Sequence, residues 1–543
     1  MTMIRFCGSS DNMAGGWKVP VESVAFDENG IKSRLLDLDQ PCYVVQEGGR
    51  IGVSNEGIWR NPNGLEGDYL ETLSMAPPLR IHQLGDADFR KTYGTQYSYC
   101  AGAMANGIAS EEMVIALGKA GFLGSFGAAG LVPARVEDAI HRIQQALPQG
   151  PYAFNLIHSP TEQALERGCA DLYLKHGVSC VEAAAYLDLT PHIVYYRAAG
   201  LGLSSQDQIE IKNKVIAKVS RREVATKFME PAPPKILQQL LSQKLITELQ
   251  ANLASKIPMA DDITAEADSA GHTDNRPLIV LLPSILALRD EIQEKHCYEQ
   301  LVRVGAGGGI GTPNAALAAF VMGAAYVVTG SINQSCVEAG ASEHSRGLLA
   351  EADMADVAMA PAADMFEMGA KLQVLKRGTL FPMRAQRLYD LYMNYDSIEN
   401  IPTKEREKLE RQIFQKGLDT IWEDTVAYFS ERDPSQIERA ADNPKRKMAL
   451  IFRWYLGLSS RWSNTGETGR EMDYQIWCGP SMGAFNAWVH NSYLADVNNR
   501  KVVDVAKHIM TGAAFLYRVQ DLRTQGIQFP LSFCEYQPQP IRS

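Results

Sequence analysis

The sequence VRVGAGGGIGTPN at residues 302–314 combines a strand, a glycine-rich loop and the start of a helix. Thr312 is a favourable N-cap residue, and Pro313 suits the first helical position. The next apolar strand, at 326–329, ends in a second small turn. Unhindered N–H groups in two such turns can converge on an anion, as they do after the last two strands of a (β/α)8 barrel. The predicted phosphate site consists of the small residues of both turns, Gly307, Gly308, Gly309, Gly330 and Ser331.

Other glycine-rich motifs fit this loop less well. A dinucleotide fingerprint needs G-x-G-x-x-G, but Ile310 or Asn314 stands at the third glycine position, depending on where the count begins. A P-loop needs lysine after its last glycine, and Thr312 stands there. A turn without a ligand is the remaining alternative, although two such turns one helix apart favour a ligand site.

A repeating pattern of short apolar strand, small-residue turn and helix begins near residue 97. The strand candidates lie at 99–104, 121–125, 152–156, 179–184, 192–197, 214–219, 262–267, 302–305 and 325–329. A barrel needs eight strands, and too few residues separate 179–184 from 192–197 for a parallel crossover. We therefore interpret 192–197 as an additional hairpin or loop strand outside a parallel (β/α)8 barrel. A doubly wound open sheet is the alternative architecture.

Composition and charge narrow the class of protein. The chain has 543 residues and a formal net charge of -10, which argues against a general nucleic-acid binder. Its nine cysteines include no C-x-x-C pair, so we expect reduced thiols in a cytoplasm and no metal site. Residues 1–16 lack a signal-peptide pattern, and the apolar run at 278–288 is too short to span a bilayer and contains Pro283. A cytosolic protein without a membrane span is expected.

Three regions are predicted along the chain. Residues 1–95 form a small mixed or β-rich region, residues 96–395 form the barrel, and residues 396–543 form a helical subdomain that binds substrate or a partner. The insertion at 231–258 reads as a polar helical segment and is either a lid over the barrel mouth or a surface decoration. After Gln334 the chain is predicted to be helical through 365–395.

Barrel active sites lie at the carboxyl ends of the strands, so residues at these positions are candidates. The first strand ends in Gly102, Ala103 and Met104, whose small neighbours leave room for a flat ring. Asn155 can bond the edge of such a ring, and the cation of Lys218 can stabilise negative charge on it. His272 follows a glycine in a polar loop and can exchange a proton near neutral pH, oriented by Asp268 or Asp274.

These residues as a set resemble the FMN-binding barrel of the nitronate monooxygenase and flavin enoyl reductase superfamily. The resemblance covers residues 97–334. More narrowly, the loop at 267–275, the segment 214–226, the additional strand and the long helical tail look like PfaD-type trans-acting enoyl reductases of polyunsaturated fatty acid and polyketide synthases.

The resemblance implies a function and a set of roles. NADPH would reduce FMN, which would deliver hydride to a trans-2-enoyl thioester on an acyl carrier protein. FMN would be bound by the residues already singled out and by one further glycine, namely Gly102, Ala103, Met104, Asn155, Lys218, Gly271, Gly307, Gly308, Gly309, Gly330 and Ser331. His272 would be the catalytic proton donor. Within the superfamily a homodimer is also expected.

Three other functions are compatible with parts of the same barrel. A nitronate monooxygenase would use the same flavin and His272 without NADPH, and a non-catalytic flavin-binding assembly factor would need neither reaction. A barrel like that of inosine monophosphate dehydrogenase shares the phosphate turns, but its cysteine loop is not evident around Cys336.

A basic cluster of Lys445, Arg446, Lys447, Arg453 and Arg461 is predicted to face an acidic carrier protein, or else to be an ordinary solvated helix face.

Overall fold

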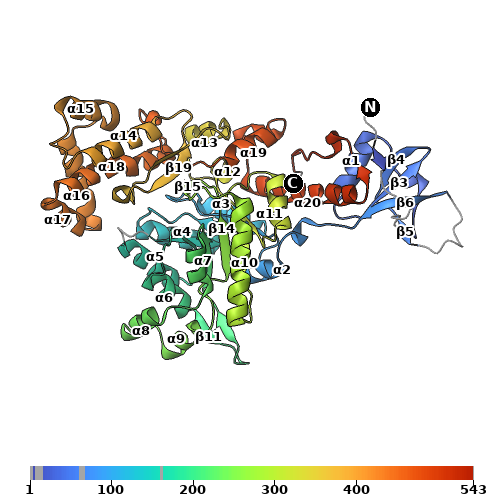
Figure 1. Ribbon diagram of the computed structural model, residues 1–543, viewed down its shortest axis with the longest axis horizontal. Helices are drawn as coiled ribbons and strands as arrows, with labels where there is room; N and C mark the ends of the chain where they lie inside the picture. Colours follow the sequence, from blue (N-terminus) through green and yellow to red (C-terminus); the bar gives the residue numbers. More distant parts are fainter. Residues whose placement is uncertain (1–3, 7–15, 60–67, 159–162, 542–543) are drawn as a thin grey trace.

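The structure is a computed structural model that describes residues 4–6, 16–59, 68–158 and 163–541. Figure 1 shows an elongated molecule with an antiparallel sheet at the N-terminal end, a barrel in the middle and a group of helices at the far end. The helix α20 (Val502–Thr524) runs from the barrel toward the N-terminal sheet. The predicted α/β class, with a β-rich start and a helical C-terminal region, is confirmed.

Eight strands form one closed barrel in which all neighbours pair in parallel. They are β7 (Tyr99–Ala101), β8 (Leu123–Phe126), β9 (Ala153–Ile157), β10 (Cys180–Ala184), β13 (Lys214–Val219), β14 (Asp262–Glu266), β16 (Arg303–Gly307) and β17 (Val327–Thr329). These are the predicted strands, and the open-sheet alternative is excluded. The ninth candidate, 192–197, is not a hairpin or loop strand as predicted but lies in α6 (Pro191–Ala199), which Thr190 caps with its side chain.

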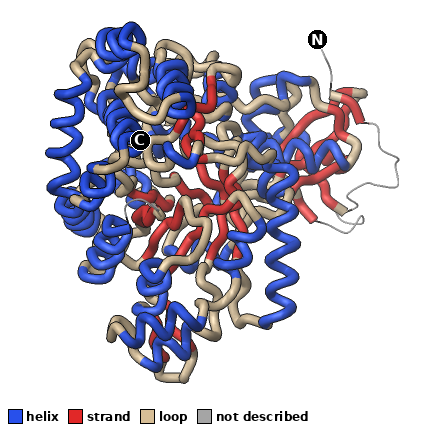
Figure 2. Tube along the Cα trace, turned by 60° about the vertical axis from the view of Figure 1, so that its left-hand side comes forward, coloured by secondary structure: helices blue, strands red, loops and turns tan. Residues whose placement is uncertain are grey.

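Each barrel strand is followed by a helix, as a (β/α)8 barrel requires. In chain order these helices are α3 (Glu111–Lys119), α4 (Pro133–Ala146), α5 (Gln163–Lys175), α6, α7 (Arg222–Met229), α10 (Leu278–His296), α11 (Pro313–Val321) and α12 (Ser331–Gln334). Thr312 caps α11 and Pro313 opens it, as predicted. Figure 2 shows the strands enclosed by these helices.

Helix α2 (Ala87–Tyr93) closes the amino-terminal end of the barrel. The ring of Phe89 stacks on Tyr326 with centroids 4.3 Å apart, and the Tyr93 hydroxyl donates to Asp262 over 2.5 Å. Asp262 is fully buried and accepts two hydrogen bonds from Arg303, at 2.8 and 2.7 Å. Among the described residues, aromatic side chains and an ion pair therefore close the amino-terminal end of the barrel.

The insertion 231–258 is not a lid. It forms α8 (Pro234–Ser242) and α9 (Glu248–Ala254), which pack on α6 and the hairpin β11 (Leu201–Leu203) with β12 (Ile209–Ile211). In Figure 1 these elements lie at the opposite end of the barrel from β15 (Gly271–His272), which is near the mouth. The prediction overlooked α7, which carries the chain back down the barrel before the insertion begins.

The N-terminal region is an antiparallel sheet in the order β4-β3-β6-β2-β5. Its strands are β2 (Trp17–Pro20), β3 (Cys42–Glu47), β4 (Arg50–Ser54), β5 (Ile58–Trp59) and β6 (Tyr69–Ala76), with α1 (Glu28–Leu36) beside them. The buried Arg518 of α20 donates to the carbonyls of Asp37 and Gln40, both at 2.7 Å. The strand β1 (Arg5–Phe6) pairs with β20 (Ile527–Gln528), so a segment close to the C-terminus also joins this region.

A small sheet that was not predicted lies at the barrel mouth, in the order β15-β19-β18. The strands β18 (Val357–Pro361) and β19 (Lys371–Leu375) fall where a helix was expected, because a short apolar run does not distinguish strand from buried helix. The helix α13 (Glu343–Ala350) precedes β18. The helices after β19 are α14 (Phe381–Asn394), α15 (Thr403–Lys408), α16 (Leu418–Arg432), α17 (Ser435–Ala441), α18 (Pro444–Thr465) and α19 (Ser481–Val489).

The hydrophobic clusters run across the predicted domain boundaries. Residues of 474–514 belong to the same buried cluster as the barrel, whereas residues of 360–456 form a second cluster. The boundaries at 95 and 395 stay a prediction. No described helix has the length and apolar character needed to cross a bilayer. The eight described cysteines are all unpaired, and Cys297 is exposed.

Candidate active site

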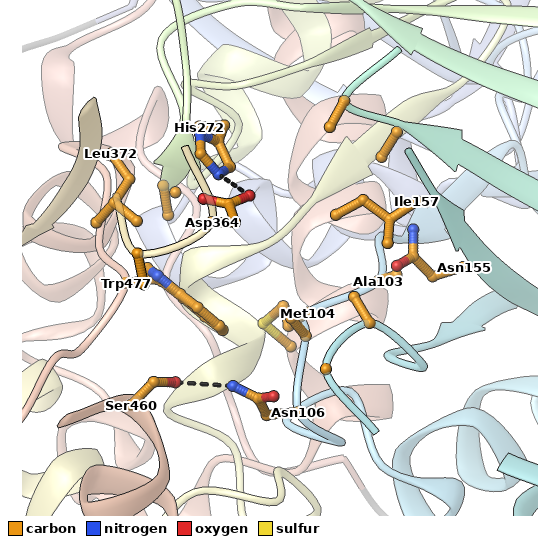
Figure 3. Close-up of a pocket in the computed structure, with 18 of the residues that line it drawn as sticks. Ala103, Met104, Asn106, Asn155, Ile157, His272, Asp364, Leu372, Ser460 and Trp477 are labelled. Atoms are coloured by element: carbon orange, nitrogen blue, oxygen red, sulfur yellow. Dashed lines mark hydrogen bonds and ion pairs between the residues drawn. The ribbon is translucent and has the colours of Figure 1, made fainter. Parts of the chain in front are cut away.

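A large cavity opens at the carboxyl end of the barrel. Its volume is about 1490 Å³, which exceeds the 300–1,000 Å³ of an ordinary ligand pocket and leaves room for more than one ligand. Every predicted site residue lines it, namely Gly102, Ala103, Met104, Asn155, Lys218, Gly271, His272, Gly307, Gly308, Gly309, Gly330 and Ser331. Figure 3 shows part of this lining. None of residues 231–258, all of which are described, contributes to it.

The two glycine turns after β16 and β17 leave open space toward the cavity. Gly309 has a φ of +75°, and a Cβ built on it or on Gly330 would meet no heavy atom within 4 Å. By contrast, a Cβ on Gly308, at φ +81°, would approach the carbonyl carbon of Ala267 to 2.7 Å. Within the described residues, no acceptor is found for the backbone N–H groups of Gly309, Gly330 and Ser331. Free donors beside unfilled space are what a phosphate requires.

Strand alternation brings three charged groups to the inner face of the barrel. Cys180 and Ile216 belong to the buried cluster around Phe89 and Tyr326 at the amino-terminal end of the barrel. Glu182 follows Cys180 by two residues, and Lys218 follows Ile216 by two residues, so each lies on the same strand face. The Nζ of Lys218 lies 3.4 Å from a Glu182 carboxylate oxygen and 3.0 Å from one of Glu266. Burial alone would lower the pKa of Lys218, but the charges of Glu266 and Glu182 outweigh it and raise the pKa. Lys218 therefore stays cationic at the base of the cavity.

Neighbouring polar groups are ordered around Glu182. Its carboxylate accepts from the backbone N–H of Ala103, at 3.1 Å, and its carbonyl accepts from the Asn155 amide, at 3.2 Å. The Asn155 side chain is therefore oriented by β10. The backbone N–H of Gly102, the residue before Ala103, donates to the Thr329 carbonyl at 2.9 Å. This hydrogen bond joins the end of the first barrel strand to the end of the last.

His272 is paired with a carboxylate from outside the barrel. It lies on β15, opposite Leu372 of β19, and its Nε2 is 3.1 Å from Oδ2 of Asp364, just beyond β18 (Figure 3). Burial by itself would lower the pKa of His272, but the hydrogen bond and charge of Asp364, with a smaller effect of Glu266, raise it above the ordinary value. The pKa of Asp364 is lowered despite its own burial. With Nε2 bonded to Asp364, protonated His272 has Nδ1–H as its other donor.

The prediction that Asp268 or Asp274 orients His272 was wrong. Asp268 accepts from Asn275 at 2.9 Å and from Gln373 at 2.8 Å. Asp274 is held by Arg221 in two hydrogen bonds of 2.8 Å, and this contact lowers the pKa of Asp274 to about 2. Both carboxylates stabilise the loop and neither contacts the imidazole.

The five predicted basic residues do not form one surface patch. Lys445 donates to the carbonyls of Tyr392 and Tyr395, and Arg446 donates to Gln436. Lys447 lies over the ring of Trp422, 5.4 Å from its centroid. Of the five, Arg453 and Arg461 line the cavity.

Several residues at the site were not anticipated. Glu182 could have been found, because it shares its strand face with Cys180 and a carboxylate on that face is unusual in an apolar strand. Asp364 follows a strand that was interpreted as helix, and the wall that α16 and α18 add to the cavity depends on contacts distant in sequence. No local signal in the sequence marks these last positions.

The residues present fit a flavin mononucleotide. The glycine turns offer N–H donors without acceptors beside open space, which suits its phosphate. Gly102, Asn155 and the cationic Lys218 border the same cavity, which suits a planar ring that gains negative charge on reduction.

Comparison with known families matches two segments of the chain. Residues 17–78 match the model of the fatty acid synthase subunit PfaD N-terminal domain. Residues 395–474 match the inserted helical domain of [acyl-carrier-protein] S-malonyltransferase. The second match covers α15 to α18, and α16 and α18 contribute a wall of the cavity.

Two similar proteins align with most of the chain. A polyunsaturated fatty acid synthase subunit of Thraustochytrium sp. is 47% identical over 93% of this chain and 33% of its own length. The polyketide biosynthesis protein PksE of Bacillus subtilis is 45% identical over 84% of this chain and 59% of its own length. This chain therefore spans less than two thirds of either relative.

A crystal structure shares the fold. The enoyl reductase domain of MlnA, from the macrolactin biosynthesis cluster of Bacillus amyloliquefaciens, is 40% identical with a TM-score of 0.78. The alignment covers 82% of this chain and 100% of that domain.

Proposed function

Because this chain belongs to the PfaD-type enoyl reductase family of polyunsaturated fatty acid and polyketide synthases, we propose that it is an FMN-dependent, NADPH-driven enoyl reductase. Its substrate is a trans-2-enoyl thioester carried on an acyl carrier protein, on which it acts in trans. The observation that carries this proposal is the convergence of glycine turns, Lys218 and the His272–Asp364 pair on one cavity.

The size of the cavity supports a reaction between two bound molecules. At about 1490 Å³ it has room for a mononucleotide and for a second ligand above its ring. Bound FMN would supply the redox chemistry, which is hydride transfer from NADPH to the β-carbon of the enoyl thioester.

The residues of the protein would bind FMN, orient the catalytic histidine and protonate the substrate. The turns at Gly309 and Gly330 would hold the phosphate, and Lys218 would stabilise negative charge at the ring edge. His272 would donate its Nδ1 proton to the α-carbon of the substrate, which completes a saturated thioester. Asp364 would keep His272 protonated and oriented, because it accepts from Nε2.

The names of the relatives support a carrier-protein partner. They are a polyunsaturated fatty acid synthase subunit and a polyketide biosynthesis protein, systems in which the acyl chain would remain tethered during reduction. The helical segment 395–474, which resembles part of a malonyltransferase, borders the cavity where such a tether would enter. A homodimer stays a prediction.

An anaerobic titration tests the proposal. The FMN-loaded protein is mixed first with NADPH and then with trans-2-butenoyl pantetheine, while flavin absorbance is followed. Bleaching followed by recovery, with butanoyl pantetheine as product, is the expected result. Bleaching only by a nitronate would indicate the monooxygenase alternative, and bound flavin that responds to neither donor would indicate the assembly factor.

A further inference from the structure

One wall of the cavity is a single face of helix α18. Arg453, Gly457 and Arg461 all line the cavity and follow one another at intervals of four residues, so they lie on the same side of the helix. With a rise of 1.5 Å per residue, the two arginines start about 12 Å apart along the axis. The helix thus presents two cations with a glycine between them.

Gly457 leaves a gap in this wall. A Cβ built on it would meet no heavy atom within 4 Å, and no positive φ requires glycine there. Glycine in a helix interior is less favourable than alanine, so helix stability does not explain the residue. The gap instead widens the cavity between the two arginines.

Most charged side chains that line the cavity have a partner of opposite charge. Four lining carboxylates pair with cations: Glu266 with Lys218, Asp274 with Arg221, Asp364 with His272 and Asp424 with Lys416. The fifth, Glu166, accepts hydrogen bonds from Tyr186 and Thr190 and lies 2.9 Å from Nδ1 of His158. Among the lining cations, Arg453 lies 3.6 Å from Glu367. Lys371 and Arg461 have no carboxylate partner among the described side chains.

The position of Arg461 is held by its neighbours. Ser460 accepts from Asn106 at 2.9 Å, which joins α18 to the loop after β7 (Figure 3). The Ser463 carbonyl accepts from Ser342 at 2.7 Å and from Ser345 at 2.8 Å. Arg461 is therefore an exposed cation on a rigid segment, close to the loop that carries Met104.

We propose that Arg461, beside the gap at Gly457, binds a phosphate group of the second ligand. A guanidinium is suited to a phosphate because its N–H groups form paired hydrogen bonds with the oxygens. The ligand is a phosphate ester carried either by the phosphopantetheine arm of an acyl carrier protein or by the adenosine 2′-phosphate of NADPH. This inference rests on the proposed function and assigns phosphate binding to the outer end of the cavity.

Calorimetry with small probes tests this site without turnover. Two matched pairs are compared on the FMN-loaded protein: 4′-phosphopantetheine with pantetheine, and adenosine 2′,5′-bisphosphate with adenosine 5′-monophosphate. The wild type is expected to prefer the probe with the additional phosphate in one pair by about tenfold or more. The pair that shows the preference identifies the source of the phosphate.

Variants assign the preference to α18. Arg461→Ala should abolish it, Arg461→Lys should retain part of it, and Gly457→Leu should weaken binding of the same probe while leaving FMN affinity unchanged. Arg411→Ala, a cation of the same helical region that does not line the cavity, is the matched control and should behave as the wild type.

The outcomes separate this inference from the proposed function. Absence of any phosphate preference in the wild type, or an equal preference in Arg461→Ala, would overturn the site. A protein that fails the anaerobic titration and still loses its phosphate preference in Arg461→Ala would refute the reductase and keep the phosphate site.

Discussion

Replacing Gly309 with alanine should weaken FMN binding far more than it destabilises the fold. The residue has a φ of +75°, a left-handed conformation that costs a residue with a Cβ about 1–2 kcal/mol. No heavy atom lies within 4 Å of the added methyl group, so no clash inside the protein adds to this cost. The methyl group would instead occupy the space expected for the phosphate.

The effect on FMN follows from the hydrogen bonds that the phosphate would lose. A hydrogen bond to a charged group contributes about 1.5–3 kcal/mol, so each lost bond should weaken binding about 10- to 150-fold. Gly49→Ala is the matched control, because Gly49 has a φ of +81°, open space around its Cβ and a position in the β3–β4 hairpin. Both variants should lose similar stability, and only Gly309→Ala should lose FMN.

The assay combines fluorescence titration of the apoprotein with FMN and thermal unfolding without FMN. The reasoning fails if Gly309→Ala binds FMN with the affinity of Gly49→Ala while showing the same loss of stability. It also fails if riboflavin, which lacks the phosphate, is weakened as strongly as FMN.

Three further predictions concern proton donation and stability. His272→Gln should slow reoxidation of the reduced flavin by the enoyl thioester by about 10²–10⁴-fold and leave flavin reduction by NADPH unchanged, as stopped-flow absorbance would record. Asp364→Asn removes the contact that raises the pKa of His272 while burial still lowers it, so the decline of enoyl reduction with rising pH should move to lower pH in the variant's pH–rate profile. An unmoved profile would exclude His272 as the proton donor. Arg303→Met leaves Asp262 buried without its cation and should cost about 3–5 kcal/mol in chemical denaturation, whereas Arg222→Met, at an exposed pair, should cost at most about 1 kcal/mol.

Local pattern was sufficient to predict the barrel and the candidate residues on it. The alternation of short strand and helix, and the N-cap at Thr312 before Pro313, are properties of consecutive residues. Because parallel strands align their carboxyl ends, positions such as Asn155 and Lys218 could be assigned to one mouth before any contact was known. The helix at 192–197 was missed because its apolar run is too short for its period to distinguish helix from strand.

What tertiary structure alone decided is which groups act on those residues. Asp364 contacts His272 across 92 positions of sequence, and it does so because β19 pairs with both β15 and β18 to form a sheet over the mouth. The wall of α18 lies still farther in sequence from the barrel strands, because α18 begins at Pro444 and the last of these strands ends at Thr329. Local sequence determines backbone conformation and the face of a strand or helix on which a side chain lies. The pairing of distant segments depends on how their apolar surfaces are buried together, and no short stretch of sequence contains that information.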